Sequence, residues 1–261
     1  MKKIVLLLFY CLCQYASAEE ALRLGILAFR PKEQALIQWQ PFAMYLQNAI
    51  GKPIALQIYN YYELTQAAEN HEVDIILTNP GHYIVLKNKY KLSAPLVTQI
   101  VQKENTLLTH FAGVIFAHKD ASLSTLADLK NTKIAVANKD SLAGYQMQAY
   151  ELASNGVSLH DAQLLIAGLP QDKVVEAVLS RKVNVGFVRT NVLEDMVHEG
   201  KLALSDIKII HEQNDPKFPF IHSTKLYPEW PLVVVPNFDE HIARALTVAL
   251  LALPSQSEAA K

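Results

Sequence analysis

Short apolar runs alternate with helix-period segments along most of this chain. Seven of these runs have β-strand character: residues 22–28, 54–59, 73–77, 112–117, 133–137, 183–188 and 207–211. Several are apolar at consecutive positions, which indicates strands buried on both faces. Such strands are typical of a largely parallel sheet with helices on each side. The alternation therefore predicts an α/β protein.

Two helical segments carry clear signals. The first has apolar side chains at helix spacing from Trp39 to Ile50, and Pro41 is expected to begin or kink it. The second follows Asp239, a good N-cap, and ends before Pro254.

The strands and helices form two similar series, residues 22–101 and 112–211. Polar or proline-containing stretches follow each series, at 102–105 and 214–219. We therefore expect two lobes, with residues 19–106 and 218–261 forming the first and residues 107–217 inserted as the second. Two crossings between lobes predict a hinge and a ligand cleft.

Residues 1–18 have the features of a cleavable signal peptide. Two lysines precede an apolar run, and Ala16-Ser17-Ala18 supplies the small residues before the expected cut. Both cysteines, Cys11 and Cys13, lie in this segment, so the exported protein would contain none. Neither follows a small residue, so we do not expect a lipid anchor. No later apolar run is long enough to span a membrane.

Charge and composition exclude several classes of protein. The 24 basic residues nearly balance the 25 acidic ones, and loss of the signal peptide would bring the net charge from -1 to about -3. A nucleic-acid binder that depends on bulk positive charge is excluded. With 51% hydrophobic residues, a disordered chain is also excluded.

The common enzyme signatures are missing from the sequence. It contains no His-Glu-x-x-His, Gly-x-Ser-x-Gly or Walker-type motif, and its nine histidines are scattered. We therefore expect neither a metal site nor a cofactor, and we predict no catalytic residue.

In α/β sheets, ligands bind beyond the carboxyl ends of strands, where helices begin. After the strand 73–77, Asn79 can cap the next helix with Pro80 in its first turn, which leaves the amides of Gly81 and His82 to face an anion. Alternatively, Asn79 is only a cap and Tyr83 only packs in the core.

A second such turn follows the strand 133–137. Its Ser141 and Gly144 lie where a helix begins, so the hydroxyl and backbone amides can donate to an oxyanion. A purely capping role for Ser141 is the alternative.

Two arginines follow strands, Arg30 after the first and Arg189 after the strand 183–188. A guanidinium is a planar fork of donors that suits oxyanions and carboxylates. The alternative is that each arginine is solvated or paired with a carboxylate.

Residues 126–136, 141–145 and 74–79 resemble the phosphate/phosphite/phosphonate-binding family of periplasmic solute-binding proteins, and the similarity covers nearly all of the chain after residue 18. The resemblance implies a two-lobed periplasmic binding protein fold (type II, Venus-flytrap) and a periplasmic location.

Motifs at 30–34, 78–83, 187–190 and 223–231 resemble a sensory branch of that family, found as input domains of histidine kinases that include tetrathionate-type sensors. Phosphonate binders tend to carry an acidic residue near the position of Arg189. Its absence here favours a ligand that is anionic throughout. Sensory relatives continue past the last helix, so ending at Lys261 suggests a stand-alone or truncated form.

We therefore expect a non-enzymatic, monomeric periplasmic protein that closes around a small oxyanion, either phosphonate- or phosphate-like or a sulfur oxyanion. Its membrane partner would be a permease or a sensor kinase, and no nucleic acid is expected. A kinase input domain and an enzyme on the same fold are the alternatives. The expected ligand-binding residues are Arg30, Thr78, Asn79, His82 and Tyr83 in the first lobe and Ser141, Gly144, Tyr145, Arg189 and Thr190 in the second.

Overall fold

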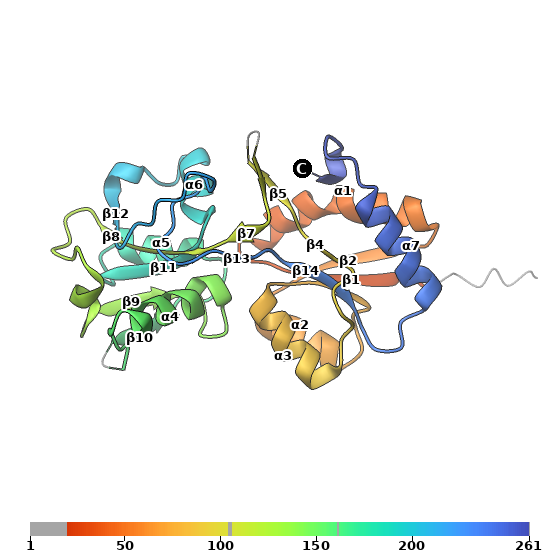
Figure 1. The fold of residues 1–261 in the computed structure, drawn as a ribbon, viewed down its shortest axis with the longest axis horizontal. Helices are drawn as coiled ribbons and strands as arrows, with labels where there is room; N and C mark the ends of the chain where they lie inside the picture. The colour runs from red at the N-terminus through yellow and green to blue at the C-terminus, as the bar shows by residue number, and fades with distance from the viewer. Residues whose placement is uncertain (1–19, 104–105, 161, 261) are drawn as a thin grey trace, which may run out of the picture.

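The computed structural model describes residues 20–103, 106–160 and 162–260, arranged as two α/β lobes side by side (Figure 1). The expected signal peptide lies outside these residues. No helix in the described part of the chain combines the length and apolarity that a membrane span requires.

Within the described residues, lobe 1 contains a five-stranded sheet in the order β2-β1-β3-β14-β4. Its strands are β1 (Leu22–Leu27), β2 (Ile54–Tyr59), β3 (Ile75–Leu77), β4 (Val97–Thr98) and β14 (Pro231–Val234). Strand β1 runs parallel to β2 and β3, whereas β14 is antiparallel to β3 and β4. Side chains such as Leu24, Leu46 and Ile76 are fully buried in the core of this lobe.

Helices cover both faces of this sheet. They are α1 (Lys32–Ile50), α2 (Tyr61–Glu69), α3 (Pro80–Tyr90) and α7 (Glu240–Leu251), with a short 3-10 turn at Glu258–Ala260. Helices α1 and α7 lie together on one face, and α2 and α3 lie on the other (Figure 1).

Lobe 2 has the same architecture, with a sheet in the order β10-β9-β11-β8-β12. Its strands are β8 (Gly113–His118), β9 (Lys133–Val136), β10 (Gln163–Ile166), β11 (Val185–Arg189) and β12 (Ile207–Ile209). Its helical elements are η1 (Leu126–Leu129), the π-helix η2 (Leu142–Gln146), α4 (Met147–Ser154), α5 (Asp172–Leu179), α6 (Val192–His198) and η3 (Leu204–Asp206). Strand β9 is parallel to β10 and β11, and β8 is antiparallel to β11 and β12.

The expectation of largely parallel sheets is confirmed for four of the five strands in each sheet, and one strand in each, β14 or β8, runs antiparallel to its neighbours. Strands β14 and β8 have the consecutive apolar residues expected of parallel strands, yet both run antiparallel to their neighbours. Helices cover both faces of each sheet, so burial alone produces these apolar runs whatever the strand direction.

Pro41 does not begin its helix, because α1 begins nine residues earlier at Lys32 and contains Pro41 in its interior, and the predicted kink stays a prediction. A proline in a helix leaves the carbonyl four residues earlier without its hydrogen bond. Here that residue is Ile37, which is 76% exposed, so water can bind the carbonyl. The N-cap predicted at Asp239 is confirmed, because its side chain accepts from the amides of His241 and Ile242.

Two neighbouring segments connect the lobes. β7 (His110–Phe111) pairs antiparallel with β13 (Tyr227–Pro228) between the two sheets (Figure 1). A hairpin of β5 (Val101–Lys103) and β6 (Thr106–Leu108) precedes β7. The boundary predicted between residues 217 and 218 stays a prediction, although Ser223 and Thr224 are hydrogen-bonded to β8 of lobe 2.

Candidate functional site

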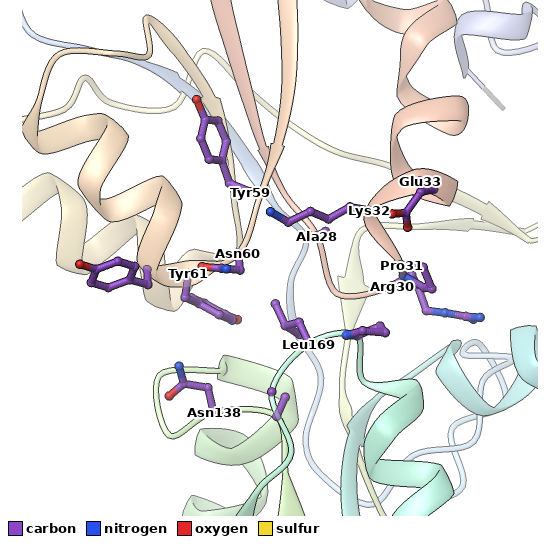
Figure 2. A pocket seen from close by; sticks show the side chains of 14 residues that line it. Ala28, Arg30, Pro31, Lys32, Glu33, Tyr59, Asn60, Tyr61, Asn138 and Leu169 are labelled. Atoms are coloured by element: carbon purple, nitrogen blue, oxygen red, sulfur yellow. The ribbon is translucent and has the colours of Figure 1, made fainter.

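A cavity of about 370 Å³ opens between the lobes. It lies at the carboxyl ends of β1 and β2 in lobe 1 and of β9 and β10 in lobe 2 (Figure 2). Its lining residues are Ala28, Arg30, Pro31, Lys32, Glu33, Tyr59, Asn60, Tyr61, Tyr62, Ala137, Asn138, Gly168, Leu169 and Pro170. This is the edge at which α/β folds bind ligands.

Two helices of lobe 1 begin at the cavity. Helix α2 is closed by a capping box, in which Asn60 Oδ1 accepts from the amide of Glu63 at 2.9 Å and Asn60 N donates to Glu63 Oε2 at 2.8 Å. Helix α1 follows Pro31, which supplies no side-chain cap within the described structure. The first residues of α1 therefore bring unsatisfied amides and a positive helix end to the cavity.

The side chain of Tyr61 joins the two lobes at the cavity wall. Its hydroxyl accepts from Asn79 Nδ2 at 2.7 Å in lobe 1 and donates to Ser141 Oγ at 3.4 Å in lobe 2. Burial raises the pKa of Tyr61 to about 12, so the phenol stays protonated at neutral pH. Tyr61 therefore lines the cavity and is hydrogen-bonded to Asn79 and Ser141, which lie at the two helix starts predicted from the sequence.

The start of α3 has the predicted form. Asn79 Oδ1 accepts from the amide of His82 at 3.0 Å, and Pro80 occupies the first turn. Lobe 2 covers this helix start: a Cβ on Gly81 would lie 3.2 Å from Gln146 Oε1 and 3.4 Å from Leu142 Cβ. The structure therefore brings the starts of α3 and η2 together.

The neighbours of Asn79 lie deeper in lobe 1. His82 is held between Thr65 and Thr78, whose hydroxyls are each 3.0 Å from one ring nitrogen. Burial lowers the pKa of His82 to about 4, so the ring is neutral at pH 7. Tyr83 packs in the core of lobe 1, and its hydroxyl donates to the carbonyl of Ser93 at 3.0 Å.

In lobe 2, Ser141 caps η2. Its Oγ accepts from the amide of Gly144 at 3.1 Å, and a Cβ on Gly144 would approach that oxygen to 2.6 Å. The half-buried Tyr145 packs on the core of this lobe. The geometry of a capping serine is therefore present, and a ligand contact for Ser141 stays a prediction.

Arg189 lies at the junction of the lobes. Its guanidinium is packed between the rings of Phe29 and Phe111, at 4.9 and 4.8 Å from their centroids. Its Nη2 donates to Glu229 Oε1 at 2.7 Å, and both side chains are buried. Next to it, Thr190 Oγ1 accepts from the amide of Ala112 at 3.3 Å.

Arg30 lines the cavity but is surrounded by carboxylates of lobe 2, namely Asp172, Asp195 and Glu199. The structure therefore gives both predicted arginines carboxylate partners. It brings Asn79 and Ser141 together through Tyr61 and places Arg189 and Thr190 at the junction. The roles of all ten predicted residues in ligand binding stay predictions.

Sequence reasoning missed the aromatic wall formed by Tyr59, Tyr61 and Tyr62. These residues directly follow or end β2, so the rule that drew attention to the turn after β3 applies to them equally. It also missed the start of α1, because Pro41 concealed the first part of that helix.

Residues 24–261 match the family described as the periplasmic substrate-binding protein of phosphonate ABC transporters. The chain belongs to this family. The predicted resemblance is thus confirmed, and the members of this family are binding proteins of the periplasm.

The family member is also similar to part of the tetrathionate sensor histidine kinase TtrS of Salmonella typhimurium, with 24% identity over 234 residues. The match covers 89% of this chain and 39% of TtrS, so the chain spans about two fifths of that relative's length.

Solved structures that share the fold include the following two. PhnD1 of Prochlorococcus marinus in complex with methylphosphonate superposes with a TM-score of 0.71 at 16% identity, covering 92% of this chain and 87% of PhnD1. XAC2383 from Xanthomonas citri bound to ATP gives 0.71 at 19% identity, covering 92% and 85%. The predicted two-lobed α/β fold of type II periplasmic binding proteins is confirmed.

Proposed function

We propose that this phosphonate-binding family member takes up a small oxyanion in the cavity between its lobes and presents the closed form to a membrane partner. The observation that carries the proposal is the uncapped start of α1, which opens on a cavity whose wall residue Tyr61 contacts both lobes.

Several groups at this cavity favour an anion, and they must outweigh the carboxylate of Glu33, which lies in the first turn of α1 and also lines the cavity. Helix α1 is 19 residues long, and the positive end of its dipole lies at Lys32. The phenol of Tyr61 keeps its hydrogen at neutral pH, because its pKa is about 12, and in our proposal it turns this hydrogen from Ser141 Oγ to the anion. Asn138, from the loop after β9, brings an amide from lobe 2 (Figure 2). These donors come from both lobes, as closure around one ligand requires.

Ligand binding drives closure only if the ligand contacts the closed form better than the open one. Tyr61 is hydrogen-bonded to Ser141 in the other lobe, so an anion bound at Tyr61 lies where both lobes meet. We assign direct contacts to Arg30 and Tyr61, which line the cavity, and we assign to Asn79 and Ser141 the positioning of the Tyr61 hydroxyl. The remaining predicted residues support these from behind: Thr78, His82, Tyr83, Gly144, Tyr145, Arg189 and Thr190.

The ligand class that fits these donors is an oxyanion of phosphorus or sulfur. PhnD1, which shares the fold, holds methylphosphonate, and the similar kinase TtrS is named for sensing tetrathionate. The similarity to TtrS favours a sensor kinase as the membrane partner, and the transporter family favours a permease.

A thermal-shift screen tests the binding function directly. The panel is phosphate, phosphite, methylphosphonate, sulfate, thiosulfate, tetrathionate and small carboxylates. A ligand that binds only the native state raises the melting temperature. We expect at least one phosphorus or sulfur oxyanion to do so and to be recovered unchanged. No shift with any of them would contradict the proposal, and recovery of an altered anion would favour an enzyme.

The Tyr61→Phe variant then tests the site. Loss of a hydrogen bond to a charged ligand costs about 1.5 to 3 kcal/mol, so affinity should fall roughly ten- to a hundredfold in a calorimetric titration. The matched control is Tyr45→Phe, because the Tyr45 hydroxyl donates to the carbonyl of Ala249 away from the cavity. Equal affinities of both variants would place the ligand elsewhere.

A further inference from the structure

Arg30 is the centre of an ion cluster that crosses between the lobes. It belongs to the loop after β1 in lobe 1. Its carboxylate partners belong to lobe 2, and they are Asp172 in α5, Asp195 in α6 and Glu199 just after α6. Its Nη2 donates to Glu199 Oε1 at 2.7 Å and to Asp172 Oδ2 at 3.2 Å. Its Nε lies 3.0 Å from Asp172 Oδ1, and its Nη1 lies 3.3 Å from Asp195 Oδ2.

These groups are removed from solvent to different degrees. Arg30 is 9% exposed and Asp172 is 5% exposed, whereas the Glu199 side chain retains 26% exposure. An ion as buried as Arg30 is costly unless carboxylates compensate it. Among the ion pairs that the described residues form, every carboxylate partner of Arg30 belongs to the other lobe.

A second cation completes the cluster. Lys201 Nζ lies 2.8 Å from Glu199 Oε2 and 3.9 Å from Asp172 Oδ2. Burial disfavours the charged form of Glu199, but Lys201 and Arg30 together outweigh it and hold the pKa of this carboxyl below its usual value. Glu199 is therefore an ionised partner for Arg30 at neutral pH.

The backbone reinforces the same contact. The amide of Gln171, just before α5, donates to the carbonyl of Phe29 at 2.9 Å. Residues 29–30 of lobe 1 are therefore fixed to residues 171–172 of lobe 2 by main chain and side chain together. Arg30 and Pro170 also line the cavity, so this contact forms one of its walls.

We propose that Arg30, Asp172, Asp195 and Glu199 form an interlobe latch that stabilises the closed form before any ligand binds. Opening the lobes would separate the guanidinium from all three carboxylates. The latch therefore shifts the open-closed equilibrium towards the closed form, and every ligand that prefers that form gains apparent affinity by the same factor. The latch concerns the empty protein and does not rest on the identity of the ligand.

The test measures the distance between the lobes without ligand. Because the sequence after residue 18 contains no cysteine, one spin label can be placed on each lobe through Asn48→Cys and Lys182→Cys, both at exposed positions. Pulsed electron resonance then gives the distance distribution. We compare the latch variants Arg30→Met and Glu199→Gln with Arg23→Met, which breaks an ion pair to Asp74 inside lobe 1.

We expect short distances to predominate when the latch is intact and in Arg23→Met, and long distances to gain population in both latch variants. Distances that stay short in Glu199→Gln and Arg30→Met would overturn the proposal, and so would a broad, long distribution in the protein with its latch intact. If Arg30→Met does not fold, Glu199→Gln decides alone, because its side chain is partly exposed and outside the cavity lining. Failure of every anion to bind would count against the proposed function and would leave these distances unchanged.

Discussion

At the scale of single residues, His82 makes the stability of the folded protein depend on pH. Its pKa is about 4 in the folded protein because the ring is buried, against 6.5 for an exposed histidine. Above pH 6.5 both states are neutral and the folded protein has its full stability. Below it the unfolded chain binds a proton that the folded chain excludes, so stability falls as pH falls from 6.5 towards 4.

We therefore expect the free energy of unfolding to drop by up to about 1 kcal/mol for each pH unit in that interval through His82. Urea denaturation at pH 7, 6 and 5 measures the slope. In His82→Gln, which keeps polar contacts to Thr65 and Thr78 without titrating, the slope should be shallower by that amount. An unchanged slope would show that His82 is readily protonated in the folded state.

The pair of Arg189 and Glu229 gives a second prediction at this scale. Removing one partner of a buried ion pair leaves an uncompensated charge and costs about 3 to 5 kcal/mol. Glu229→Leu should therefore be much less stable in urea denaturation, and the double variant Arg189→Met, Glu229→Leu should recover most of the loss. A single variant as stable as the unmodified protein would contradict the importance of this pair.

The same double variant separates the two roles of Arg189. If the guanidinium also contacts the anion, the stable double variant still loses roughly ten- to a hundredfold in affinity. If Arg189 serves only the junction of the lobes, titration with the identified anion gives an affinity within about twofold of the unmodified protein, a difference below about 0.5 kcal/mol.

At the scale of elements, two N-caps offer a matched comparison. Asn79 caps α3 at the site, and Asp239 caps α7 on the far side of lobe 1. Each alanine substitution should cost about 1 kcal/mol of stability. Only Asn79→Ala should also weaken anion binding, because Asn79 Nδ2 positions the hydroxyl of Tyr61. If calorimetric titration gives equal affinities for both variants, Asn79 has no role in anion binding.

These two caps also mark what the sequence could predict. A cap and the helix that it begins lie within a few residues of each other, so the caps at Asn79 and Asp239 can be predicted from the local sequence. The seven predicted strands were located to within about two residues for the same reason, whereas β4, β10 and β14 of the two sheets were not predicted. Strand direction is not local, since β14 pairs with β3 across most of the chain.

The carboxylate partners of the two arginines could not be predicted from the sequence for the same reason. Nothing near Arg189 in sequence identifies Glu229, and Arg30 finds its carboxylates more than a hundred residues away. A strand-end arginine has the same sequence signal whether it binds a ligand or a distant carboxylate. The carboxyl-end rule located the cleft, and only the folded chain distinguished its lining residues from the residues behind them.

At the scale of the whole molecule, the lobes meet through the paired crossings β7 and β13 and through contacts across the cleft. Short neighbouring crossings allow one lobe to rotate relative to the other with few changes in backbone conformation. The position of the lobes is then set by whatever bridges the cleft, whether the latch, the Tyr61 contacts or a ligand.

The place of β14 in the sheet of lobe 1 also determines the order in which the molecule can be made. β14 lies between β3 and β4, yet it follows every strand of lobe 2 in the chain. During synthesis, lobe 2 can complete its sheet while β3 and β4 still lack their shared neighbour. The sheet of lobe 1, on which one side of the cleft is built, is therefore completed only when the chain has been extended to Val234.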